Sequence, residues 1–143
     1  MKFRYTEIRN HQDPNRPFYR PYVIVRLAHR TKHKDIIVLV DSGADLCLFH
    51  SDIGKLIGVD VESGLRLAFQ GVSGASARAY LHSVSLTVRG VGSITLDVGF
   101  TDSMAVGTGL LGQQGFFEQF QVNFELNEKI FEVVQNQEGI KPR

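Results

Sequence analysis

Apolar and polar residues alternate along much of this chain, and the alternation predicts strands. It is clearest over residues 93–100 (SITLDVGF) and 121–126 (QVNFEL), where every second residue is apolar. A period of two is typical of strands with one buried face. The other stretches of strand-forming composition are residues 22–29, 35–40, 65–69, 77–88 and 129–134. We therefore expect a mostly β fold.

Helical periodicity is limited to two short stretches. Residues 52–57 are expected to form a helix that Ser51 caps and that ends before Gly58. Residues 113–120 place three phenylalanines on one face of a second short helix, although Gly115 lowers the helix propensity there. The strands are thus expected to be accompanied by one or two short helices.

The chain divides into three parts. Residues 1–21 form an N-terminal extension, in which residues 3–8 alternate like an edge strand and residues 10–21, with three prolines, are expected to be irregular. Residues 22–134 contain the other predicted elements without a linker, which indicates a single domain. Residues 135–143 are a polar C-terminal tail.

Composition and charge narrow the possible functions. The chain has 143 residues, enough for one modest core, and a net charge of +1, which gives no expectation of nucleic-acid binding. The N-terminus lacks the apolar segment of a signal peptide, and no apolar run approaches the roughly 20 residues that cross a bilayer. A cytoplasmic protein without membrane contact is therefore expected. Cys47 is the single cysteine, which excludes an internal disulfide, and the scattered histidines favour no metal site.

The stretch IIVLVDSGADLCLF (36–49) carries the candidate chemistry, because five apolar residues lead directly to Asp41. A buried strand that ends at a carboxylate restricts that side chain and lowers the dielectric around it, as a general base requires. Gly43 lets a backbone N–H approach the carboxylate, and the Ser42 hydroxyl can bind a neighbouring backbone group. The alternative is an ordinary Asp-Ser-Gly turn at the end of a core strand.

Three motifs in order along the chain resemble retropepsin-like aspartic peptidases, the single-lobe relatives of pepsin. VDSGAD (40–45) is similar to their active-site sequence, QGVSGAS (70–76) lies where they carry the flap that closes over substrate, and LLG (110–112) lies where their chain passes beneath the active-site loop. The resemblance covers about residues 22–134. It implies a mostly β, closed barrel-like single lobe with a flap hairpin.

The resemblance also implies roles for individual residues. Asp41 would be the catalytic acid or base, Ser42 would form a hydrogen bond across a dimer axis, and Gly43 would place its N–H beside the carboxylate. Asp45 would contact the substrate backbone and support the interface. The full set of substrate-binding residues implied in this way is Ala44, Asp45, Gly71, Val72, Ser73 and Gly74.

Pepsin-like chemistry needs two aspartates that face one water molecule, and this chain contains one Asp-Ser/Thr-Gly sequence. The second aspartate is therefore expected from a second copy, in a C2 homodimer that brings the two Asp41 side chains together. The two carboxyl groups would share one proton. The expected function is an aspartic endopeptidase that acts on peptide or protein substrates without a metal or cofactor.

The chain departs from the retroviral pattern after its LLG element. Retroviral proteases usually continue with an arginine that pairs with the second aspartate of the active-site sequence, but Gln113 and Gln114 follow Gly112 here. Asp45 is therefore expected to lack that partner. The alternative function is a catalytically weak or inactive dimerisation or peptide-binding module with the same fold.

Overall fold

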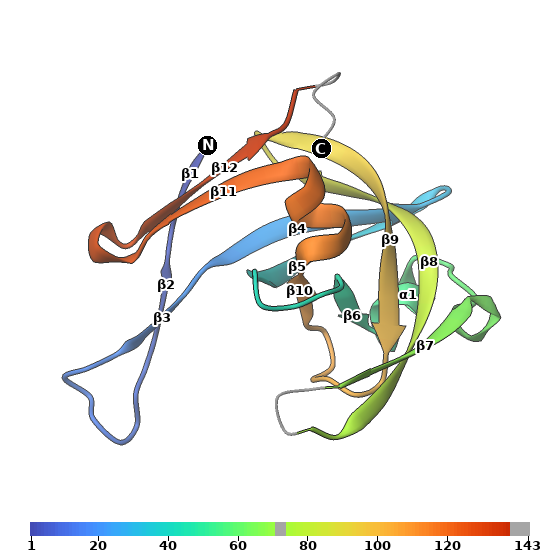
Figure 1. Cartoon of the computed structure of the whole chain (residues 1–143), viewed down its shortest axis with the longest axis horizontal. Helices are drawn as coiled ribbons and strands as arrows, with labels where there is room; N and C mark the ends of the chain where they lie inside the picture. Colours follow the sequence, from blue (N-terminus) through green and yellow to red (C-terminus); the bar gives the residue numbers. More distant parts are fainter. Residues whose placement is uncertain (71–73, 138–143) are drawn as a thin grey trace.

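A computed structural model describes residues 1–70 and 74–137, which form two β-sheets and a two-stranded ribbon (Figure 1). The larger sheet has seven strands in the order β4-β5-β10-β6-β9-β8-β7, and β4 also pairs with β8. Its strands in chain order are β4 (Tyr22–His29), β5 (Lys32–Val40), β6 (Leu48–His50), β7 (Leu65–Gln70), β8 (Ser76–Val88), β9 (Gly92–Thr101) and β10 (Gly109–Leu111). The mostly β prediction is confirmed.

The stretches selected by alternation all form strands. In β5 the residues with buried side chains are Ile36, Val38 and Val40, which alternate with more exposed neighbours as a half-buried strand requires. β4 and β5 form the expected hairpin, and its basic tip is a tight turn in which Arg30 has a positive φ of 54°. The charged tip is exposed, whereas the buried residues of the hairpin are apolar.

The smaller sheet joins the two ends of the chain. It contains β1 (Lys2–Arg4), β12 (Ile130–Gln135) and β11 (Phe120–Glu125), with β12 in the centre. The segment expected to be irregular instead contains β3 (Phe18–Arg20), which pairs with β2 (Thr6–Ile8). The irregular assignment of residues 18–20 was therefore wrong, because three prolines at spaced positions still leave three residues free to pair. The division into extension, domain and tail stays a prediction, and residues 138–143 of the tail lie outside the described part.

The first helix is α1 (Ser51–Leu56), and its cap differs from the prediction. Ser51 is the first helical residue and is buried, whereas His50 is the N-cap and its Nδ1 accepts a hydrogen bond from the N–H of Asp52 at 3.1 Å. His50 has the extended backbone that a capping position requires. Gly58 follows the helix with a φ of +79°, as predicted. Two single turns, η1 (Val61–Ser63) and η3 (Leu126–Glu128), complete the short helical elements.

The second predicted helix is shorter and irregular. The helical turn η2 (Gln113–Phe117) is interrupted, because Gln114 and Gly115 have non-helical backbone angles. The expected aromatic face is nevertheless formed: Phe116 and Phe120 are buried and stack with ring centroids 4.9 Å apart. Hydrophobic spacing therefore located the packing face correctly, while glycine broke the helix.

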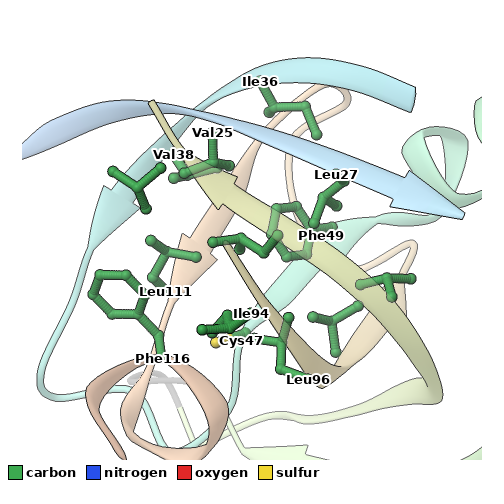
Figure 2. Close-up of a cluster of buried hydrophobic side chains, with 14 of the residues drawn as sticks. Val25, Leu27, Ile36, Val38, Cys47, Phe49, Ile94, Leu96, Leu111 and Phe116 are labelled. Carbon is green, nitrogen blue, oxygen red and sulfur yellow. The ribbon is translucent and has the colours of Figure 1, made fainter. Parts of the chain in front are cut away.

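The larger sheet and η2 enclose one hydrophobic core, part of which Figure 2 shows. Its labelled members come from β4, β5, β6, β9, β10, η2 and the loop before β6, and they are Val25, Leu27, Ile36, Val38, Cys47, Phe49, Ile94, Leu96, Leu111 and Phe116. Strands distant in sequence thus converge on the same interior. Among the described residues, no helix is long and apolar enough to cross a membrane.

We expect Leu111→Ala to lower the free energy of unfolding by about 2–5 kcal/mol, because it leaves a cavity between strands at a fully buried position. Leu126→Ala is the matched control, since Leu126 is an exposed leucine in η3 and its truncation should change the stability by less than about 0.5 kcal/mol. Urea unfolding followed by circular dichroism measures both. Equal losses in the two variants would contradict this account of the core.

Candidate active site

Strand β10 lies between β5 and β6, although it comes about sixty residues after them in the chain. It runs parallel to β5, with Leu111 beside Val40, and antiparallel to β6, with Gly109 beside Phe49. The loop of residues 41–47, which joins β5 to β6, therefore begins and ends at strands held by the same third strand. This arrangement anchors the loop at both ends.

Asp41 is the first residue of this loop and is partly buried. Its backbone N–H donates to the carbonyl of Leu111 at 2.9 Å, and its carbonyl accepts from the N–H of Ala44 at 3.2 Å. The N–H of Gly43 donates to the Asp41 carboxylate Oδ1 at 3.0 Å. The carboxylate is thus oriented by a fixed backbone donor, as the sequence predicted for Gly43.

The segment after β10 holds the rest of the loop. Gln113 N–H donates to the carbonyl of Ala44 at 2.8 Å, and Gln114 N–H donates to the carbonyl of Asp45 at 2.9 Å. Gly112 lies against the loop so closely that a Cβ there would be 2.3 Å from the carbonyl oxygen of Leu46. Only glycine permits this approach, which explains the glycine in the LLG element.

Sequence reasoning missed the role of the Gln113 side chain. Its Nε2 donates to the carbonyl of Ser42 at 2.8 Å, so it binds the loop that contains Asp41. Asp45 is exposed and takes part in none of the ion pairs found among the described residues. In the sequence, the position after Gly112 stood out only because it lacks an arginine. Nothing indicated that an amide donor there would reach a carbonyl of the loop of residues 41–47.

Cys47 is the last residue of the loop, and its buried side chain forms hydrogen bonds with the segment after β10. Its Sγ accepts a hydrogen bond from the N–H of Gly112 at 3.3 Å and donates to the carbonyl of Gln114 at 3.4 Å. Burial raises the pKa of the Cys47 thiol, so the neutral form is favoured. This agrees with a structural thiol rather than a reactive one.

The hairpin of β7 and β8 carries the other predicted site residues. Its strands pair from Leu65 with Leu81 to Gln70 with Ser76. Gly71, Val72 and Ser73, which were predicted to bind substrate, lie outside the described residues. Gly74 has a φ of +79° and open space around the position of a Cβ. The structure thus brings residues 41–45 together in one anchored loop and places Gly74 at the end of a separate hairpin.

Comparison with solved structures identifies the fold as retropepsin-like. By sequence, the chain matches no family model and no curated protein. Among solved structures, the chain is similar to a retropepsin-like aspartic protease from Rickettsia conorii, with a TM-score of 0.55 and 12% identity over 91% of this chain and 98% of that chain. It is also similar to the EIAV protease complexed with the inhibitor HBY-793, with a TM-score of 0.51 and 22% identity over 66% of this chain and 82% of that chain. At these identities the likeness establishes the fold.

We expect Gly112→Ala to destabilise the protein by roughly 3 kcal/mol, because the new methyl group meets backbone oxygens that cannot move without breaking the loop. Gly107→Ala is the control: that position has a positive φ but no atom within 4 Å of the added Cβ, so it should cost only about 1 kcal/mol. Chemical denaturation compares the two. A smaller loss for Gly112→Ala than for Gly107→Ala would disprove the close approach.

The Cys47 thiol should make stability depend on pH in alkaline solution. Because its pKa is raised in the folded state, its contribution is complete below the unfolded-state pKa of roughly 8.5 and declines as the pH rises above that value. The decline should be at most about 1.4 kcal/mol per pH unit. Urea unfolding of the wild type and of Cys47→Ala between pH 7 and pH 10 isolates this effect. Parallel pH profiles for the two proteins would show that the thiol is not buried.

Proposed function

We propose that this protein is an aspartic endopeptidase whose active form is a C2 homodimer, with one Asp41 contributed by each copy. The observation that supports it best is the Asp41 carboxylate at the end of a buried strand, oriented by the N–H of Gly43 at 3.0 Å, within a retropepsin-like fold. Two such loops related by a two-fold axis would place like residues opposite each other. The proposed substrate is a peptide or protein, and no cofactor is needed.

The chemistry follows from two carboxyl groups that share one proton. The ionised carboxylate accepts a proton from the bound water, and the water oxygen forms a bond to the carbonyl carbon of the scissile peptide. The protonated carboxyl group donates its proton to the carbonyl oxygen, which gives a neutral tetrahedral intermediate. Their pKa values would belong to the pair rather than to either residue, so the rate should fall when both groups are protonated and when both are ionised.

The remaining predicted residues are assigned to substrate binding. We infer that the β7–β8 hairpin acts as the flap and that a peptide binds beneath it as an extended strand, through main-chain hydrogen bonds. Ala44 and Asp45 would contact the peptide from the loop, and residues 71–74 would contact it from the flap. Gln113 donates to the carbonyl of Ser42 and so helps to fix the loop that carries Ala44 and Asp45.

Asp41→Asn should reduce peptide cleavage by roughly 10³-fold, because an amide can neither accept the proton of water nor share one with its partner. Asp60→Asn is the matched control, since Asp60 is an exposed aspartate beside η1 and its change should leave the rate within about twofold. Cleavage of a fluorogenic peptide library between pH 3 and pH 7 measures both. Unchanged cleavage by Asp41→Asn would rule out the proposed enzyme.

A second candidate is a peptide-binding or dimerisation module without catalysis. The observation that favours it is the neutral Gln113 after Gly112, whose side chain binds the Ser42 carbonyl in the loop of residues 41–47. Asp45 in the same loop is exposed. Inhibitors that mimic the tetrahedral intermediate, such as pepstatin, separate the two candidates. Binding that disappears in Asp41→Asn favours the enzyme, whereas peptide binding that survives this change favours the module.

A further inference from the structure

Residues 6–20 form a projecting hairpin, here called the N-terminal arm, that consists of β2, β3 and the turn between them (Figure 1). All of these residues are described, and none of them is buried. Among the described strands, β2 and β3 pair only with each other. A two-stranded hairpin without a hydrophobic partner is marginally stable in water, so an arm of this kind needs another surface to hold it.

The tip of the arm is organised by its own hydrogen bonds. The Asn10 side-chain oxygen accepts from the N–H groups of Gln12 and Asp13, and its amide donates to the carbonyl of Arg16 at 3.0 Å. Asp13 in turn accepts from the N–H of Asn15. Asparagine and aspartate turns of this kind restrict the conformation of the tip, although the two strands alone remain marginally stable. Such preorganisation lowers the entropic cost of binding.

The base of the arm is attached beside Asp41. The N–H of Tyr5 donates to the carbonyl of Lys129 at 2.9 Å, and the N–H of Val40 donates to the carbonyl of Pro21 at 3.0 Å. Val40 directly precedes Asp41, so the second strand of the arm joins the body next to the proposed dimer axis. In Figure 1 the arm and the β7–β8 hairpin both project past the loop that joins β5 to β6.

The two faces of the arm differ. Tyr19 faces its own chain, because the Lys129 Nζ lies 4.5 Å from the centroid of its ring. Side chains alternate along a strand, so Phe18 points to the opposite face, where it pairs across the ribbon with Ile8. Phe18 is 47% exposed. The Arg20 guanidinium lies 5.3 Å from the centroid of the Phe18 ring, so the arm presents an apolar pair with a cation beside it away from the body.

An apolar groove of about 410 Å³ lies at the base of the arm and continues this surface. Thr6 of the arm is part of its wall, and the exposed Ile24 and Ile37 pair across β4 and β5 within it. Contiguous apolar surfaces that are exposed to solvent often mark interaction sites. Phe18 on the arm and Ile24 and Ile37 in the groove each lie within a few residues of Pro21 or Val40, whose hydrogen bond attaches the arm.

We propose that the N-terminal arm clasps a second copy of this chain, with the Ile8–Phe18 face packed against the partner. This inference rests on the proposed function, because a dimer that joins two Asp41 residues brings the partner to the base of the arm. With about 3.3 Å per extended residue, the arm is at most roughly 20 Å long, which is enough to reach over the adjoining edge of a neighbouring protomer. Two-fold symmetry makes each copy contribute one arm, so the same apolar pair is buried twice.

The test measures dimer dissociation constants by analytical ultracentrifugation in the Asp41→Asn background, which prevents self-cleavage. We expect Phe18→Ser to raise the dissociation constant at least about tenfold, since an apolar anchor is lost from both arms. An arm-trimmed chain, in which Asn-Gly replaces residues 7–19 and joins Thr6 to Arg20, should raise it further. Leu56→Ser is the control, because Leu56 is 60% exposed on α1 and should leave the constant unchanged. Circular dichroism verifies folding, which removal of unburied residues should preserve.

The outcomes separate the arm from the proposed enzyme. An Asp41→Asn dimer whose dissociation constant does not respond to Phe18→Ser or to trimming disproves the clasp and leaves the enzyme intact. Arm variants that dimerise normally but, with Asp41 restored, cleave peptides more slowly would show that the arm binds substrate, which also overturns the clasp. A wild-type chain that cleaves peptides as a monomer contradicts the two-copy mechanism and the clasp together, whereas a stable dimer without peptidase activity contradicts the enzyme alone.

Discussion

The insertion of β10 between β5 and β6 is the constraint on which the candidate active site depends. The chain leaves β5 at Val40 and re-enters the sheet at Leu48, and the position between these strands is filled by residues 109–111. The hydrogen bond from Asp41 N–H to the Leu111 carbonyl is part of this insertion. Because the contact joins residues seventy positions apart, the geometry of the loop depends on a strand that is distant in the sequence.

The same constraint explains why glycine and cysteine occur where they do. Gly112 must pass within van der Waals distance of the Leu46 carbonyl, and its N–H must find a buried acceptor. The Cys47 sulfur provides that acceptor at 3.3 Å without adding a charge to the core. A serine would offer a shorter, more polar acceptor at a fully buried position, where polar groups are costly. The thiol is thus suited to holding a backbone N–H inside an apolar interior.

Much of the fold could be predicted from the sequence because long strands leave a clear period. β9 is long enough for its alternation to be clear, and the residues around Asp41 were located by the apolar run that precedes them. β10 has three residues, too few for any period, and only its resemblance to a known motif pointed to it. β3 was missed because it exists through its pairing with β2. The His50 cap was missed because the neighbouring Ser51 is the commoner type of capping residue.

Two hydrogen bonds on successive peptide groups connect these observations. Val40 N–H binds Pro21 at the base of the arm, and Asp41 N–H binds Leu111 in β10. The peptide groups on either side of Val40 are therefore held by segments from opposite ends of the chain. The Gln113 side chain adds a neutral donor to this region, through its hydrogen bond to the Ser42 carbonyl. The geometry of a charged pair can vary and its strength falls as salt is added, whereas backbone and amide hydrogen bonds require a fixed geometry. Rigidity around Asp41 thus arises from strand placement and from hydrogen bonds of fixed geometry rather than from a charged pair.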